Sequence, residues 1–307
     1  MLITQADLES RIKETRTTVA KALEPQANGS DKKIVSVTTT VVAAILRQSV
    51  KLDFESMPDH AAIARTIAQS LSSGNKLSIF APSCPDYKHD GSTYTFGELG
   101  SGVSLLGTCQ IEFAEKFLPI LDIHGIPYDY TVLTADIEAE DDTMLVKNMV
   151  TKAEAIERIK ETIKETAEYI NGLLMPQNGS TIRSTGFLEE FEEFLDLQRK
   201  HETLILQLQS TSAPFRKSLE RVHEGRLNLY ARLFPEATQT ELLSLMPRTI
   251  RTMAQYAALG NLAREQNAII TSHRTLNIPA YNYTRLFLGK PEDYRRLPVL
   301  SFDRRIY

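Results

Sequence analysis

The stretch "KLSIFAPSCPDY", residues 76–87, joins a short apolar run to a polar segment that is bracketed by Pro82 and Pro85. Short apolar runs that stop at turn-forming residues are typical of buried strands. The segment that follows offers a hydroxyl, a thiol and a carboxylate within four residues. The stretch therefore predicts a buried strand, "KLSIF", which ends at Pro82 beside a candidate ligand site.

Helical patterns lie on both sides of this strand. Apolar side chains recur at helical spacing between Pro58 and Ser72, and "CQIEFAEKFLPILDIHG" predicts a helix that Gly125 closes. "YDYTVLTAD" predicts a second strand. The order helix, strand, loop, helix, strand is typical of parallel sheets with crossover helices. We therefore predict an α/β fold with a Rossmann-like parallel sheet and flanking helices.

Three further segments have simpler or more ambiguous signals. Residues 5–23 predict an amphipathic helix. "IVSVTTTVVAAILRQSV", residues 34–50, fits either a strand or a buried helix, because the periodicity of its β-branched run does not separate the two. "DYKHDGSTYTF", residues 86–96, predicts a polar loop.

From Thr151 onward, long helical patterns dominate the chain. They are "TKAEAIERIKETIKETAEYINGLL", "FLEEFEEFLDLQRKHETLILQLQ", "FRKSLERVHEGRLNLYARLF" and "TIRTMAQYAALGNLAREQ", and "MPQNGSTIRSTG" breaks the first from the second. "NAIITSH", residues 267–273, predicts a strand that returns to the sheet. We therefore divide the chain into an α/β core over 1–150, a largely helical subdomain over 151–265 and a C-terminal segment over 266–307 that returns to the core sheet.

The composition narrows the class of protein. With 307 residues, 42% hydrophobic and 24% charged, the chain is long enough for a large core, and its net charge of −4 lacks the basic excess of nucleic-acid binders. Cys84 and Cys109 match neither a disulfide framework nor a zinc site. The charged first residues lack a signal peptide's apolar core, and no apolar run is long enough to span a membrane. We expect a cytoplasmic protein that binds a small-molecule substrate and neither nucleic acid nor a membrane, and the oligomeric state stays open.

Polar residues end three of the predicted strands, at 83–87, 136–138 and 272–274. Ligands of open parallel sheets bind outside the carboxyl ends of the strands. If the three strands are neighbours, their ends converge on one cleft. We therefore expect an active site for a small, polar, anionic substrate at this edge of the sheet.

Cys84, Asp86 and Tyr87 are the candidate substrate contacts at the first of these ends. Cys84 is either a nucleophile, activated by a nearby cation, or a small buried residue. Asp86 either binds polar groups of the substrate or holds a turn after Pro85. The two prolines indicate stiff ends that stop the strand and orient the loop.

Asp136 and Glu138, in "TADIEAEDD", are the candidate metal ligands or acid–base groups. On a strand they would leave the backbone on the same side, about 7 Å apart, an arrangement that suits Mg²⁺ or Mn²⁺. Asp136-Ile137-Glu138 resembles the D-x-D element of GT-A-type glycosyltransferases, with Glu where that family usually has Asp. The resemblance implies metal-dependent transfer from a nucleotide-sugar. The alternative is an acidic cap for the helix that follows.

His273, which follows "AIIT", is the candidate general acid or base, because the pKa of histidine lies near neutrality. Its neighbour Arg274, and Arg226 and Arg251 on predicted helices, are candidates for binding an anionic substrate, since the guanidinium fork suits carboxylate and phosphate. The alternatives are a structural histidine and solvated arginines.

"FGELGSGVSLLG", residues 96–107, is rich in glycine. Such a loop before a helix either cradles a phosphate or makes a tight turn with close helix packing. The segment has no P-loop lysine and no dinucleotide-binding spacing, which favours the turn.

The layout of Pro82 to Tyr87 followed by Glu98-Leu99-Gly100 is similar to that of the isocyanide-synthase and dityrosine-biosynthesis family. In that family, too, a helix and a strand precede a proline-rich loop and an acidic helix start. The Lys-Ser-Pro run and the Asp-Gly pair of the family are absent here, so the resemblance implies a biosynthetic enzyme without assigning residue roles.

These observations favour a group transferase. The alternatives are a metal-dependent glycosyltransferase, an isocyanide-synthase-like biosynthetic enzyme, and a non-enzymatic interaction protein built on the long charged helices.

Overall fold

A computed structural model describes residues 5–23, 31–49, 60–85, 87–89, 94–96, 99–100, 102–233, 235–244, 247–273 and 299–302. Its centre is a five-stranded sheet in the order β5-β4-β1-β6-β7, in which every neighbouring pair is parallel. These strands are β1 (Leu77–Ser83), β4 (Tyr128–Thr134), β5 (Thr181–Gly186), β6 (Ile269–His273) and β7 (Val299–Phe302). Counted along the chain, the order is 3-2-1-4-5, which is that of Rossmann-type sheets. The predicted fold class is confirmed.

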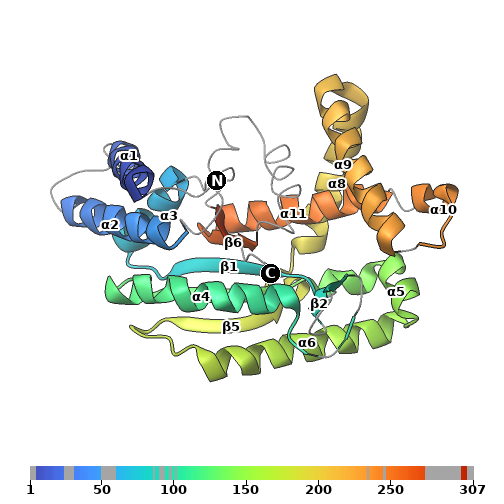
Figure 1. The fold of residues 1–307 in the computed structure, drawn as a ribbon, viewed down its shortest axis with the longest axis horizontal. Helices are drawn as coiled ribbons and strands as arrows, with labels where there is room; N and C mark the ends of the chain where they lie inside the picture. Colours follow the sequence, from blue (N-terminus) through green and yellow to red (C-terminus); the bar gives the residue numbers. More distant parts are fainter. Residues whose placement is uncertain are drawn as a thin grey trace.

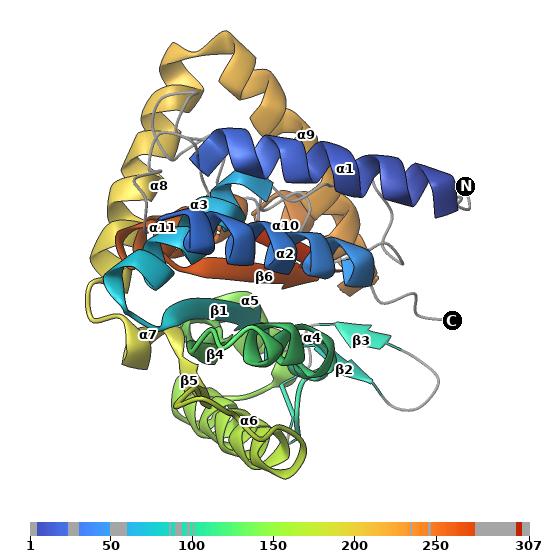
Figure 2. The ribbon, with the colours of Figure 1, turned by 90° about the vertical axis from the view of Figure 1, so that its left-hand side faces the viewer.

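Helices cover both faces of this sheet (Figure 1, Figure 2). One face packs against α2 (Asp31–Ser49), α3 (His60–Ser73), α4 (Leu105–Ile123) and α6 (Lys152–Leu173), with α1 (Gln5–Leu23) over α2 and α3. The other face packs against α7 (Phe187–Glu190), the start of α8 (Phe194–Thr211) and α11 (Pro247–Glu265). The remaining elements are the strands β2 (Tyr87–His89) and β3 (Tyr94–Phe96), the 3₁₀ helix η3 (Asp136–Glu140) and the helices α5 (Asp142–Asn148), α9 (Ala213–Leu233) and α10 (Gln239–Ser244).

Alternation along β1 assigns its side chains to the two layers. Leu77, Ile79 and Ala81 are buried against the first helical layer, and Phe80 is buried against the second. Because both faces of the strand are covered, the run is almost continuously apolar, as parallel strands are. This is why "KLSIF" carries a clear strand signal.

The ambiguous segment 34–50 lies mostly in helix α2. Thr38, Val41, Val42 and Ile45 are buried, and they recur at the three- and four-residue spacing of one helix face. Packing of that face against α1, α3 and α4 outweighs the strand preference of its β-branched residues.

Besides β7, which lies in the C-terminal segment expected to return to the sheet, strands occur in two places where none was expected. β5 lies within "MPQNGSTIRSTG" and pairs with β4, so the segment predicted only to break the helices forms an outer strand of the sheet. β2 and β3 pair antiparallel within the segment predicted as a polar loop. β1 also continues through Pro82 to Ser83, one residue beyond its expected end.

The helices α8 and α9 form an arm that rises above α11 in both views (Figure 1, Figure 2). At the base of the arm, His201 of α8 is buried, and its Nε2 lies 2.7 Å from Nδ2 of Asn261 on α11. Asn261 Nδ2 is a donor, so Nε2 accepts and the proton is on Nδ1, which has no hydrogen-bond partner among the described residues. Burial lowers the pKa of His201 from its ordinary value of 6.5.

Acid is therefore expected to weaken the packing of α8 on α11. The folded state holds His201 neutral below pH 6.5, where the unfolded chain already binds a proton, so the free energy of unfolding decreases as the pH falls through 6.5. In His201→Gln, whose Oε1 can still accept from Asn261, this part of the pH dependence is lost. Melting temperatures at pH 7.5 and pH 5.5 measure the effect. If the melting temperature falls by the same amount in wild type and in His201→Gln, the prediction is wrong.

Candidate functional site

The three polar strand ends meet at one edge of the sheet. β4, β1 and β6 are consecutive in the sheet and parallel, so Ser83, Thr134 and His273 end at the same edge. The condition for convergence of the three strand ends, that the strands are neighbours, is met. In Figure 1 this carboxyl edge lies on the side of β2 and α5.

The strand order reverses between β1 and β6. β1 pairs with β4 as far as Ser83, and β6 pairs with β7 as far as His273. Between β1 and β6, however, only Ile79 and Phe80 of β1 are paired. The last residues of β1 are therefore paired with β4 and those of β6 with β7, and the ends of β1 and β6 are not paired with each other. Ligands of doubly wound sheets bind at this reversal point.

Pro82 explains why the ladder between β1 and β6 stops. Leu77 N donates to Pro127 O, and Ser83 O accepts from Ala135 N, so the odd-numbered residues of β1 turn their backbone groups toward β4. Pro82 consequently faces β6, and a proline has no N–H to donate. The proline within the strand thus opens the edge where the site is expected.

The side chain of Gln110, from α4, joins the two separated strands. Gln110 is 0% exposed, and its Nε2 donates to Pro82 O (2.8 Å) and to Thr271 O (3.3 Å). Its Oε1 accepts from Thr271 Oγ1 at 2.7 Å. Tyr130 of β4 donates its hydroxyl to Gln110 O at 2.9 Å, and burial raises the pKa of Tyr130, which keeps it a donor. These contacts form the switch-point network, consisting of Pro82, Gln110, Tyr130 and Thr271.

Serine and threonine hydroxyls lie beside this network at the ends of β1 and β4. Ser83 Oγ is 2.8 Å from Ser104 Oγ, and Ser104 caps the N-terminus of α4 by accepting from Gly107 N. Thr134, paired in register with Ser83, is buried, and its hydroxyl has no hydrogen-bond partner among the residues that the structure describes. An unpaired buried hydroxyl at a strand end marks a position where a ligand can supply the partner.

The glycine-rich segment is held by one face of α6. Arg158 donates to Leu99 O, Thr162 donates to Gly100 O, and Gly102 N donates to the carboxylate of Glu165. Since these backbone groups are already engaged by α6, the contacts favour the tight-turn interpretation over a phosphate cradle. Gly102 adopts a φ of 95°, which glycine tolerates readily.

Asp136 and Glu138 do not alternate on a strand, which corrects the geometry expected for them. The chain leaves β4 at Thr134 and forms the 3₁₀ helix η3, because the N–H groups of Glu138 and Asp141 turn back to carbonyls three residues earlier. The Asp136 carboxylate accepts from Leu188 N at 3.1 Å, which ties η3 to α7. Burial raises the pKa of Asp136, and the hydrogen bond from Leu188 opposes that shift.

Arg251 lies near this end of β4. Its Nη1 donates to Glu140 O at 3.5 Å, and its Nε is 3.9 Å from Glu202 Oε1. One turn earlier on α11, Arg248 forms an ion pair with Asp141. Thus α11 brings a guanidinium to η3, as a clamp for an anion would require.

The other predicted site residues are only partly placed. Cys84 follows Ser83 and is half-buried. Tyr87 begins β2, His273 ends β6 and Arg226 lies on α9, but their side chains, and all of Asp86 and Arg274, are outside the described residues. Among the residues that are described, no three His, Cys, Asp or Glu side chains are grouped to hold a metal ion.

Sequence reasoning missed the residues that support this edge, namely Ser104, Gln110 and Thr271. The available signal was a single uncharged amide, Gln110, within the predicted helix "CQIEFAEKFLPILDIHG". A buried amide there needs partners, and the nearest strand ends can supply them.

No protein-family model matches this chain, and no curated protein matches it significantly. In the part of the chain with described coordinates, no helix combines the length and apolar character needed to cross a membrane. Its strand order and covered faces define an α/β protein of the Rossmann-like class with an added helical region.

Proposed function

We propose that the protein is an enzyme that binds a small, polar, anionic substrate at the carboxyl edge of the sheet and transfers a group to or from it. The observation that carries the proposal is the reversal of strand order at β1 and β6, where Pro82 ends the ladder between them. Polar strand ends on both sides of the reversal support it. Proteins of this sheet class place their ligands there.

The proposal assigns roles by position. Cys84, Asp86 and Tyr87 follow β1 and contact the substrate, and His273, at the end of β6, serves as general acid or base. Arg274 follows His273 and contributes positive charge. Asp136 takes a supporting role, because its carboxylate already accepts a backbone N–H from α7.

Arg251 is the described cation best suited to meet an anionic substrate. It is exposed, and its two polar contacts are long, at 3.5 and 3.9 Å. Contacts of this length contribute little to stability, so the guanidinium can turn to a carboxylate or phosphate at small cost.

A ligand panel tests this function. Nucleotides, sugar nucleotides and amino acids, with and without Mn²⁺, are added to the full chain, and the melting temperature is measured. One ligand class is expected to raise it by roughly 5 °C at about 100 times its Kd. Arg251→Gln is expected to weaken that ligand about tenfold, whereas Arg16→Gln, on the exposed face of α1, leaves the affinity unchanged.

A crystal structure with the selected ligand completes the test. Density between the ends of β1 and β6 is the expected result. A nucleotide-sugar that binds only with Mn²⁺ would instead favour the glycosyltransferase. No shift with any ligand, together with loss of a protein partner upon changes along residues 152–200, would replace the proposal with an interaction protein.

A further inference from the structure

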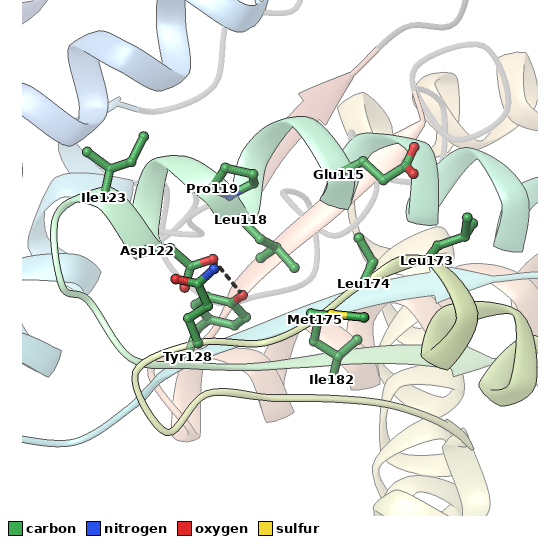
Figure 3. Close-up of a pocket in the computed structure, with 11 residues that line it drawn as sticks. Glu115, Leu118, Pro119, Asp122, Ile123, Tyr128, Leu173, Leu174, Met175 and Ile182 are labelled. Carbon is green, nitrogen blue, oxygen red and sulfur yellow. Dashed lines mark hydrogen bonds between the residues drawn. The ribbon is translucent and has the colours of Figure 1, made fainter.

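A groove of about 430 Å³ lies at the opposite edge of the sheet, between the C-terminal ends of α4 and α6 (Figure 3). Tyr128 begins β4 and Ile182 belongs to β5, so the groove lies near the amino ends of these strands. The volume is within the range of sites that hold small molecules. The groove is separate from the candidate site at the carboxyl edge.

Apolar side chains make most of its walls. α4 contributes Leu118 and Pro119, and the end of α6 with the residues after it contributes Leu174 and Met175. Met175 is 85% exposed, which is unusual for a large apolar side chain. An apolar ligand that covers this side chain would gain the free energy of removing it from water.

The charged groups of the groove all have one sign. Glu115 and Asp122 lie two turns apart on the same face of α4, and no Lys, Arg or His is among the described residues that line the groove. Such a lining attracts cations and repels anions.

The carboxylate of Asp122, which lines the groove, is incompletely hydrogen-bonded. Its Oδ2 accepts from the Tyr128 hydroxyl at 3.3 Å, and its Oδ1 is buried with no hydrogen-bond partner among the described residues (Figure 3). Burial raises the pKa of Asp122, and the Tyr128 hydrogen bond opposes that shift. Burial also raises the pKa of Tyr128, with the charge of Asp122 acting in the same direction, so Tyr128 remains a donor. A cationic donor beside Asp122 would favour its charged form and complete its hydrogen bonding.

We propose that this groove binds a small amphiphilic amine, with the ammonium beside Asp122 and the apolar part against Leu118, Leu174 and Met175. The carboxylates of Asp122 and Glu115 lie along α4, with apolar walls between and beside them, and this lining matches an amphiphilic cation (Figure 3). The proposal is independent of the function proposed for the carboxyl edge.

Hexylamine, hexan-1-ol and hexanoate test the proposal, because they share one apolar chain and differ in the head group. Binding to the full protein is followed by calorimetry and by the ε-methyl NMR signal of Met175. Hexylamine is expected to bind at least about tenfold more tightly than hexanol and to shift the Met175 signal, and hexanoate is expected not to bind.

Asp122→Asn removes the charge while keeping the shape, and is expected to abolish the preference for hexylamine over hexanol. The matched change Asp196→Asn, on the exposed surface of α8, leaves the preference intact. Ile182→Thr weakens both ligands alike, since it reduces the apolar wall. A pH series on the wild type gives a second measurement, in which hexylamine affinity falls in acid as Asp122 becomes protonated.

Equal binding of hexylamine and hexanol, or an unshifted Met175 signal, would overturn the proposal. Concentration-dependent dimerisation that Met175→Lys abolishes, without hexylamine binding, would overturn it in favour of a second copy of the chain. Neither outcome affects the ligand panel for the carboxyl edge, whose readouts are Arg251 and density at β1 and β6.

Discussion

Replacing Gln110 with leucine is expected to lower the free energy of unfolding by about 3 kcal/mol. Leucine fills a similar volume but donates nothing to Pro82 O or Thr271 O, and it leaves Thr271 Oγ1 without its 2.7 Å partner. Each buried polar group that loses its partner costs roughly 1–3 kcal/mol. Urea denaturation measures the change.

A double-mutant cycle separates the switch-point network from simple packing. Thr271→Val removes the hydroxyl that donates to Gln110 Oε1, so the cost of Gln110→Leu is expected to be about 1 kcal/mol smaller in the Thr271→Val background. A cost below about 1 kcal/mol for Gln110→Leu alone, or strict additivity in the cycle, would show that the network does not hold the strands.

Gly186→Ala is expected to destabilise the protein by about 2 kcal/mol. The carboxylate of Asp136 occupies the space that the new Cβ would take, and Asp136 Cβ lies only 3.2 Å from that position. The whole Asp136 side chain must therefore move, which breaks its hydrogen bond to Leu188 N. Chemical denaturation measures the cost.

Two comparisons make this result specific. In the Asp136→Ala background, Gly186→Ala is expected to cost about 1 kcal/mol less than in wild type, because the obstructing carboxylate is gone and only the Cβ contact at 3.2 Å remains. Gly172→Ala, in α6, places its Cβ in open space and is expected to stabilise the protein by up to about 1 kcal/mol. An equal cost of Gly186→Ala in both backgrounds would contradict the close packing of Asp136 on Gly186.

The parts of the fold that the sequence predicts are those whose elements are buried on both faces or strongly periodic. The apolar runs of β1, β4 and β6 and the pattern of α4 are of this kind. β5 was missed because only its last residues are buried, so "TIRSTG" shows no apolar run. The helical state of 34–45 depended on packing against other helices, which local sequence does not report.

Some features of the candidate site could likewise be predicted from the sequence, and others could not. The meeting of three strand ends follows from parallel topology, and was predicted. The geometry of Asp136 was not predicted, because the chain forms the 3₁₀ helix η3 from Asp136 onward where a strand end was expected. Gln110 was not singled out, because its importance arises from two carbonyls that are 28 and 161 residues away in the chain.

The chemical make-up of the switch-point network has a consequence for pH-dependence measurements on the proposed enzyme. An amide, an alcohol and backbone carbonyls carry no proton equilibrium at the pH values where proteins stay folded, and burial moves that of the Tyr130 phenol further upward. The switch-point network therefore stays uncharged over the pH range in which the protein is folded. The base of the α8–α9 arm differs, because it contains the titratable side chain of His201. For the proposed enzyme, a pH–rate profile is consequently expected to report groups outside this network, while the network itself contributes no titration.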